Sequence, residues 1–219
     1  MFANRKEAGL ALAAALETYR DGDVVVLALP RGGVPVGYEI ARALEAPLNV
    51  IVVRKLGAPD EPELGVGAVV DGDLPQTVLN EEVIEALAVT PEYLANEIQA
   101  QLAEIRRRQE IYRKGGPAPQ LAGRTVIVVD DGIATGGTVR AALRGVRRAS
   151  PAKLVLATPV APLEALESLR TEVDDLVCLE TPSDFDALGQ FYHDFRQVSD
   201  EEVIHLLERA NSGREDPAL

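Results

Sequence analysis

The residues with the clearest chemical potential are two adjacent carboxylates, Asp130 and Asp131, in the stretch VIVVDDGIATGGTV over residues 126–139. The aliphatic run before them is typical of a strand buried on both faces, and ligands of open parallel sheets bind beyond the carboxyl ends of such strands. Carboxylates there suit hydroxyl donors such as a ribose diol, or a divalent cation. A turn without a ligand is the alternative, but two acids at a buried strand end need some partner.

The loop after the aspartates is suited to a phosphate monoester. Glycines let the backbone approach closely and offer N–H donors, and the helix predicted from residue 137 adds a partial positive charge at its N-terminus. The candidate phosphate-binding residues are Gly132, Ala134, Thr135, Gly136, Gly137 and Thr138. Thr138 stands where a P-loop has lysine, so the loop lacks the cation that reaches terminal phosphates. Together with the acids, it predicts a ribose 5-phosphate ligand.

A second anion site is predicted at Arg31, Gly32 and Gly33, between the aliphatic run 24–30 and a helical stretch. One cation and two glycines at a helix N-terminus favour an anion; the alternative is a tight turn with a solvated arginine. Arg54 and Lys55 at the end of a further predicted strand are additional candidate cations.

These residues require a scaffold, and the alternation of apolar runs and helical patterns predicts an α/β fold with an open parallel sheet flanked by helices. Strands are expected at residues 24–30, 49–55, 125–131, 153–161 and 175–181, and helices at 4–20, 34–45, 137–149, 162–170 and 199–210. We interpret residues 1–219 as a single domain, since that length supports one substantial core.

Four segments interrupt or extend this rhythm. Residues 56–80 are predicted to form a lid loop and a β-hairpin, and residues 81–114 a helical insertion whose long helix starts at Pro91. Residues 182–199 are a candidate hood, and residues 211–219 a frayed tail. The basic cluster at 106–114 is either a solvated helix end or a further anion site. The insertion is expected to pack on the core or on a partner subunit, in a homodimer.

Composition narrows the class of protein. The net charge of −13 favours solubility and disfavours binding to nucleic acids or anionic membranes. The one cysteine, Cys178, excludes an intrachain disulfide, so a reducing, cytoplasmic compartment is expected. No apolar run is long enough for a membrane span. Cys178 is interpreted as packing, His193 as a structural residue, and His205 has no assigned role.

The segment VIVV followed by DDGIATGGT resembles the phosphoribosyl-pyrophosphate signature of the type I phosphoribosyltransferases. Residues 30–33 match the position of that family's pyrophosphate loop, and Arg54 with Lys55 matches the stem of its lid, so the likeness covers residues 20–185. The resemblance implies a type I phosphoribosyltransferase-like core in which Asp130 and Asp131 bind the ribose 2- and 3-hydroxyls. It also implies that residues 134–138 hold the 5-phosphate, and that a non-proline cis peptide lies beside Arg31.

The implied activity is transfer of a 5-phosphoribosyl group from phosphoribosyl pyrophosphate to a small nitrogenous acceptor, a nucleobase, in nucleotide metabolism. Mg²⁺, held mainly by the substrate and only indirectly by the two acids, would neutralise the departing pyrophosphate. The implied catalytic residues are Asp130, Asp131, Arg31 and Lys55, with Arg54 as an alternative cation. A lid would exclude water, because hydrolysis competes with transfer.

The acceptor is narrowed by one departure from the family. Ala134 stands where 6-oxopurine transferases have an aspartate, so hypoxanthine and guanine are disfavoured. Phe185, Phe191 and Tyr192, with Phe195, are expected to stack on a planar base in the hood; a satellite core is the alternative. Two other functions stay open: a non-catalytic regulatory protein that senses phosphoribosyl pyrophosphate, and a hydrolase using the same cradle.

Overall fold

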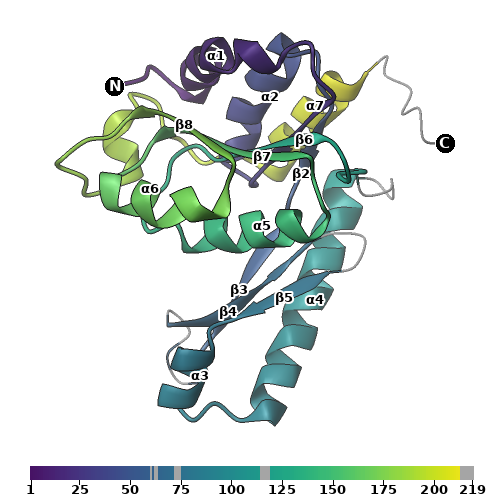
Figure 1. The fold of residues 1–219 in the computed structure, drawn as a ribbon, viewed down its shortest axis with the longest axis vertical. Helices are drawn as coiled ribbons and strands as arrows, with labels where there is room; N and C mark the ends of the chain where they lie inside the picture. Colours follow the sequence, from purple (N-terminus) through teal and green to yellow (C-terminus); the bar gives the residue numbers. More distant parts are fainter. Residues whose placement is uncertain (60, 62–63, 72–74, 114–118, 213–219) are drawn as a thin grey trace.

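The main sheet of the computed structural model, which describes residues 1–59, 61, 64–71, 75–113 and 119–212, has five parallel strands in the order β2-β1-β6-β7-β8. The strands are β1 (Val24–Ala28), β2 (Leu48–Val50), β6 (Thr125–Val129), β7 (Lys153–Val160) and β8 (Asp175–Glu180). Each pairs in parallel with its neighbours (Figure 1). The predicted open parallel sheet is therefore confirmed.

Helices cover both faces of this sheet. One face carries α1 (Arg5–Ala15), α2 (Gly33–Ala43) and α7 (Asp200–Asn211), and the other carries α5 (Gly137–Arg148) and α6 (Leu163–Leu169) (Figure 1). In β1, Val24 and Val26 pack into the core under α1 and α2, whereas Val25 and Leu27 pack into the core under α5 and α6. The strand is thus apolar throughout because both of its faces are buried.

The strand predicted over residues 49–55 is wrong, because the chain there forms two strands in two sheets. β2 ends at Val50, and β3 (Val53–Gly57) begins a separate antiparallel sheet with the order β3-β4-β5. The buried residues Ile51 and Val52 join them. The run is aliphatic across the junction and contains no turn residue, so its pattern does not reveal the change of sheet.

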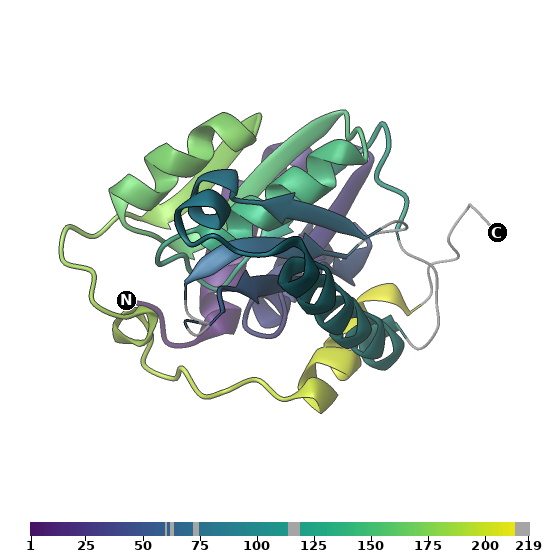
Figure 2. The same cartoon turned by 90° about the horizontal axis from the view of Figure 1, so that it is seen from below.

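The second sheet and two helices form an arm that projects from the core in Figure 1 and is seen from below in Figure 2. The arm comprises β3, β4 (Gly65–Val70), β5 (Gln76–Leu79), α3 (Glu81–Ala86) and α4 (Pro91–Arg113). β4 and β5 pair antiparallel over the segment predicted as a hairpin, and α3 and α4 occupy the predicted insertion. Leu56 and Gly57, the first two residues of the segment predicted as lid and hairpin, belong to β3.

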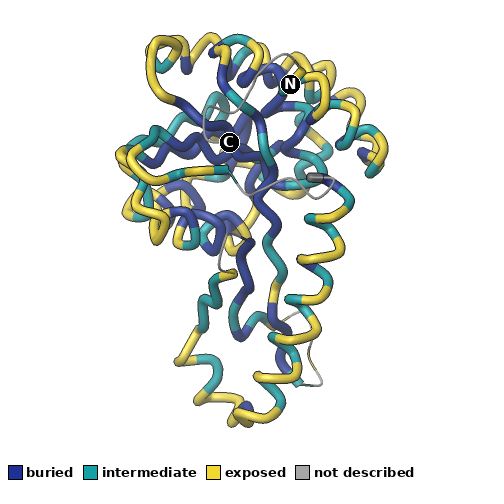
Figure 3. The backbone as a smooth tube through the Cα atoms, turned by 90° about the vertical axis from the view of Figure 1, so that its right-hand side faces the viewer, coloured by how far each residue is buried: buried dark blue, intermediate teal, exposed yellow. Residues whose placement is uncertain are grey.

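The arm packs on the core through α4 on one side and through its strands against α5 on the other. Ile105 and Tyr112 of α4 are buried in the same core as α1, α2 and α7, and Figure 3 shows that the far end of the arm is more exposed than the central strands. Lys114 of the basic cluster and residues 213–219 of the predicted tail lie outside the described residues.

The segment predicted as a hood, 182–199, carries the short 3₁₀ helix η3 (Leu188–Phe191) and packs against the N-terminus. Phe2 bridges to Tyr192, and the Phe2 amide donates a hydrogen bond of 2.8 Å to the Phe191 carbonyl. In β8, Cys178 is half-buried, and burial raises the pKa of its thiol to about 11. None of the described helices is long and apolar enough to cross a lipid bilayer.

Candidate functional site

The two loops predicted to bind anions meet where the strand order of the main sheet reverses, between β1 and β6. Loops at the carboxyl ends of strands on the two sides of a reversal diverge and leave a crevice for a ligand. A Cβ added to Gly32 would lie 2.1 Å from Oδ2 of Asp131, and one added to Gly33 would lie 2.7 Å from the Val129 carbonyl oxygen. Glycine is therefore needed at both positions for the close approach of these loops.

The arginine of the first loop is linked to the arm and to α7. The Pro30–Arg31 peptide is cis, as the resemblance implied. The Arg31 guanidinium lies 3.9 Å from Oδ1 of Asp200, and the Tyr112 hydroxyl donates to the same oxygen at 2.5 Å. Burial, with this hydrogen bond, raises the pKa of Tyr112 to about 12. Arg31 itself is about one-third exposed, so it is accessible to a ligand.

The carboxylate of Asp131 is held by the N-terminal helix. Nε of Arg5 lies 2.7 Å from Oδ2 of Asp131, and both side chains are only 11% exposed. The Arg5 guanidinium carbon lies 4.0 Å from the centroid of the Phe195 ring, and a further N–H donates to the Arg196 carbonyl at 2.8 Å. The Tyr192 hydroxyl donates to the Asp131 carbonyl oxygen at 2.6 Å. These contacts fix the orientation of Asp131 before any ligand binds.

Asp130 differs from its neighbour because its carboxylate lacks such a close cation among the described residues. Its Oδ1 accepts a hydrogen bond of 2.9 Å from the Asp131 amide. Burial and then the negative charge of Asp131 raise the pKa of Asp130 well above its ordinary value. Two adjacent carboxyl groups with such different partners are characteristic of a site that handles hydroxyl groups or protons.

Residues 134–138 form a cup at the N-terminus of α5, which we call the phosphate cup. Gly136 caps the helix with a φ of +77°, a conformation that favours glycine. The other cup residues, Ala134, Thr135, Gly137 and Thr138, are exposed. A Cβ added to Gly137 would meet no atom within 4 Å. The cup therefore has space for a phosphate at the positive end of the helix dipole.

The two candidate cations of β3 face in opposite directions. Lys55 lines a pocket of about 790 Å³ together with Thr135, Gly137 and Thr138 of the cup. Nε of Arg54 instead donates to Oε1 of Gln101 on α4 at 2.8 Å. The structure thus brings Lys55 to the phosphate cup and leaves Arg54 against the arm.

The hood aromatics divide into two pairs. Tyr192 is 5% exposed and packs with Phe2 and Phe195, at centroid distances of 5.7 Å and 5.0 Å. Phe185 and Phe191 stack on each other at 5.3 Å and are half-buried. The alternative of a satellite core therefore describes Tyr192 and Phe195. Phe185 and Phe191 remain the candidates for contact with a base, and Phe191 also packs against this core. His193 and His205 are both exposed.

Sequence reasoning missed Arg5, Tyr112 and Asp200. None has a local signal, because each acts through a partner at least 88 positions away in the chain. The basic cluster is partly neutralised: Glu104 pairs with Arg107 and Arg108, and these hydrogen bonds lower the pKa of Glu104 to about 2.

The donor set suits Mg²⁺ only in part. Among the described residues, no group of three or more His, Cys, Asp or Glu side chains could hold a metal ion. Asp130 and Asp131 supply the oxygen atoms that Mg²⁺ prefers, but Arg5 already binds one oxygen of Asp131. These residues fit an ion carried mainly by a bound diphosphate, with the carboxylates as distant partners.

Comparisons with known proteins agree with this geometry. A family model described as "phosphoribosyl transferase domain" matches residues 4–196. In Mycobacterium tuberculosis, strains H37Rv and CDC 1551 each have a relative whose name provisionally assigns it to the phosphoribosyl transferases. Each is 44% identical over 211 residues, which covers 96% of this chain and 47% of the relative. The chain thus spans about half the length of the curated relatives it matches.

One solved structure is similar over nearly its whole length. The crystal structure of TT1426 from Thermus thermophilus matches with a TM-score of 0.83 and 42% sequence identity. The match covers 95% of this chain and 98% of that one.

Proposed function

The chain belongs to the phosphoribosyl transferase domain family, and on that premise we propose that it transfers a 5-phosphoribosyl group from phosphoribosyl pyrophosphate to a small nitrogenous acceptor. The observation that carries the proposal is the convergence at one strand reversal of the acidic pair, Asp130 and Asp131, with the loop at 31–33. The phosphate cup follows the acids within the same loop. A sugar diol, a diphosphate and a monophosphate thus each have a chemically matched partner.

The acidic pair receives the ribose. Arg5 binds Oδ2 of Asp131, so a ribose hydroxyl donates to Oδ1, while the second hydroxyl bonds to Asp130. Burial raises the pKa of Asp130 because the ionised carboxylate loses its hydration. A ribose hydroxyl that donates a hydrogen bond to this carboxylate stabilises the ionised form and so lowers the pKa again. Two carboxylates beneath the sugar also stabilise the positive charge that develops when the anomeric bond breaks.

The leaving pyrophosphate takes both electrons of the anomeric C–O bond, and Arg31 lies in the loop that faces it. The guanidinium neutralises the developing negative charge, and its contact with Asp200 positions it. Mg²⁺, when bound with the pyrophosphate, supplies further charge neutralisation. The backbone around Gly32 and Gly33 is close to the acids, so the diphosphate and the diol bind in one crevice.

The acceptor is a planar nitrogen base that approaches from the hood. Phe185 and Phe191 present half-buried rings for stacking. Ala134 is exposed and carries no acid, so an acceptor that needs proton exchange at a purine ring nitrogen lacks its partner there. We therefore propose adenine, a pyrimidine or another non-6-oxopurine base as the acceptor class.

Calorimetry with phosphoribosyl pyrophosphate and Mg²⁺ tests the donor site. We expect Asp130→Asn and Asp131→Asn to weaken binding about 100-fold, because hydrogen bonds to charged groups contribute roughly 1.5–3 kcal/mol each. Asp21→Asn, at an exposed turn position, is the matched control and should bind as the wild type does. Equal binding by all four proteins would overturn the proposal.

A screen of adenine, uracil, xanthine and orotate for pyrophosphate release then tests transfer, and xanthine, as a 6-oxopurine, is the base that should give no release. Release with one of these bases supports the enzyme. Tight binding of the donor with no release from any base would favour the non-catalytic sensor, and release without an acceptor would favour a hydrolase.

A further inference from the structure

The phosphate cup opens into a pocket that is much larger than a phosphate. Its volume of about 790 Å³ falls within the roughly 300–1,000 Å³ of pockets that bind whole small molecules. One wall is the side of α5 that carries Arg140 and Arg144, and the opposite wall is formed by the arm strands, including Val53 and Ala68. A ligand whose phosphate lies in the cup therefore has room to extend into this pocket, between α5 and the arm strands.

The position of this pocket shows which end of a phosphoribosyl ligand would enter it. Its described lining includes Thr135, Gly137 and Thr138, but neither of the two acids nor any residue of the loop at 31–33. In the proposed binding mode, the ribose diol and the anomeric carbon lie beside the two acids and the loop at 31–33, which are outside this pocket. The pocket is therefore reached through the 5-phosphate, and not through the carbon at which transfer occurs.

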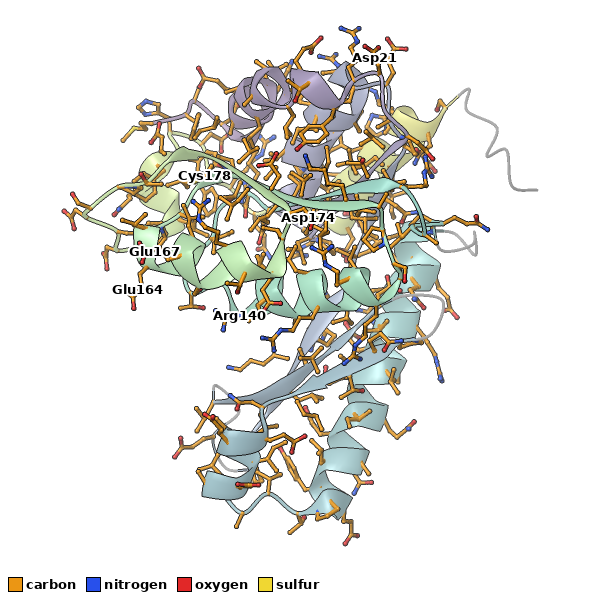
Figure 4. All side chains as sticks on the ribbon, in the orientation of Figure 1. Asp21, Arg140, Glu164, Glu167, Asp174 and Cys178 are labelled. Carbon is orange, nitrogen blue, oxygen red and sulfur yellow. The ribbon has the colours of Figure 1, made fainter. Side chains whose placement is uncertain are left out.

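Three cations line the pocket, one on the arm and two on α5. Lys55 lies on the arm side, and Arg140 and Arg144 lie four residues apart, on one face of the helix. Arg144 already pairs with Glu172 at 2.7 Å. Arg140 donates from a terminal nitrogen to the Ser168 carbonyl at 3.5 Å, and its buried Nε has no hydrogen-bond acceptor among the described residues. Figure 4 labels Arg140 on the side of α5 turned toward the arm. Arg140 follows Thr138 of the cup by two residues and lines the same pocket, so a second phosphate next to the cup would lie beside its guanidinium.

The far end of the pocket has a different chemistry. Asn80, Glu81 and Glu82 lie at this end, where α3 begins, and Val78 and Leu79 add apolar surface. The exposed carboxylates would repel a further phosphate, but they accept hydrogen bonds from hydroxyl or amino groups. Apolar side chains beside them suit the face of a ring. The pocket thus combines the phosphate cup, cations, and hydroxyl acceptors beside apolar side chains.

We propose that this pocket binds a group joined to the 5-phosphate through a second phosphate. The protein then recognises ribosyl compounds with a substituted 5-diphosphate, the chemical class of ADP-ribose. The first phosphate occupies the cup, the second contacts Arg140 and Lys55, and the distal sugar and ring occupy the end near α3. This inference rests on the proposed function, because it assumes a ribose 5-phosphate in the cup.

Calorimetry with ribose 5-phosphate and with ADP-ribose as the probes tests the inference. We expect ADP-ribose to bind at least about tenfold more tightly, the factor for one charge-assisted hydrogen bond. Arg140→Gln should reduce this preference to about threefold or less, and Arg140→Lys, which keeps the charge, should retain more of it. The matched control is Arg147→Gln, on the same helix but paired with Asp174, which should retain the full preference.

Equal or weaker binding of ADP-ribose by the wild type would overturn the inference, as would a preference unchanged in Arg140→Gln. Phosphoribosyl pyrophosphate with Mg²⁺ is the third probe, because it separates the two proposals. If it binds while ADP-ribose shows no gain over ribose 5-phosphate, only the extended pocket is rejected. If none of the three probes binds, the proposed function and this inference both fail.

Discussion

The acidic pair and the phosphate cup lie in one loop, yet the protein treats them in opposite ways. Asp131 is 8% exposed, bound by Arg5 at 2.7 Å and packed against Gly32. Four of the five residues of the cup, 134–138, are exposed, and a Cβ added to Gly137 would meet no atom within 4 Å. Asp131 is thus positioned by protein contacts, whereas most of the cup is exposed to solvent.

This difference separates folding from binding within one site. Where protein groups already satisfy each other, a substitution breaks native contacts and lowers the free energy of unfolding. Where a residue is exposed and serves only a bound anion, a substitution leaves the native contacts unchanged and lowers the affinity for that anion. Four predictions test this separation, and they are ordered below by the expected size of the effect.

Arg5→Gln should have the largest effect on stability. Removing one partner of a mostly buried ion pair leaves the Asp131 carboxylate uncompensated, which typically costs about 3 kcal/mol of unfolding free energy. Urea unfolding followed by circular dichroism measures the loss. The control Arg20→Gln breaks only exposed pairs and should change stability by less than about 0.5 kcal/mol.

A double variant sharpens this prediction. Arg5→Gln/Asp131→Asn removes both charges, so it should be more stable than Arg5→Gln alone. If the loss of unfolding free energy in the double variant equalled the sum of the losses in the two single variants, Arg5 and Asp131 would not be coupled, and Asp131 would not be held by Arg5.

Gly33→Ala should lower the unfolding free energy by about 2 kcal/mol, because the added methyl group would overlap the Val129 carbonyl and force the backbone to shift. Gly137→Ala, which meets open space at the start of α5, should be neutral or more stable by about 0.4–1 kcal/mol. Thermal and urea unfolding of both variants compare the two regions directly. Equal losses would contradict the contrast between them.

The raised pKa of Asp130 predicts a pH dependence. In the unfolded chain, Asp130 loses its proton above the ordinary pKa of about 3.9, whereas in the folded protein it keeps the proton to a higher pH. The free energy of unfolding therefore decreases as pH rises from the unfolded pKa to the folded pKa. The slope is at most about 1.4 kcal/mol per pH unit. Asp130→Asn keeps the neutral form throughout, so its stability relative to the wild type should increase between pH 4.5 and 7.5. A constant difference in unfolding free energy would contradict the raised pKa.

Thr138→Ala should have the smallest effect on folding and a selective effect on binding. The side chain is exposed, so stability should change by less than about 0.5 kcal/mol. Loss of one hydroxyl donor to a phosphate should weaken ribose 5-phosphate binding by about fivefold to tenfold. Calorimetry measures the affinity and urea unfolding measures the stability of the same preparation. A loss of stability without a loss of affinity would show that Thr138 has a structural role and does not bind the phosphate.

Local patterns predicted the parts of the molecule that depend on neighbours in the chain. The run 125–129, the acids after it and the glycines before α5 form a continuous strand–loop–helix unit, so their relative positions follow from spacing. The parallel sheet could be predicted as well, because buried strands alternated with helices. The approach of the loop at 31–33 to the acids then follows from the strand order.

Long-range contacts could not be predicted in this way. Arg5 lies 126 positions from Asp131, and nothing in the sequence around an arginine at the start of a helix identifies a buried partner. Tyr192 was expected to stack on a ligand, but it forms a cluster with Phe2, which lies at the opposite end of the chain. An aromatic side chain is suited equally to a binding face and to a small core, and only tertiary structure decides between them.

The two-residue junction Ile51–Val52 also determines which positive side chain serves the ligand. Successive side chains of a strand alternate between its faces, so Lys55 is directed to the pocket and Arg54 to Gln101. Inserting or deleting one residue at the junction would exchange the two, placing a bidentate guanidinium beside the cup and an ammonium against the arm. The length of this connector therefore determines which cation faces the pocket, although neither Ile51 nor Val52 is among the described residues that line it.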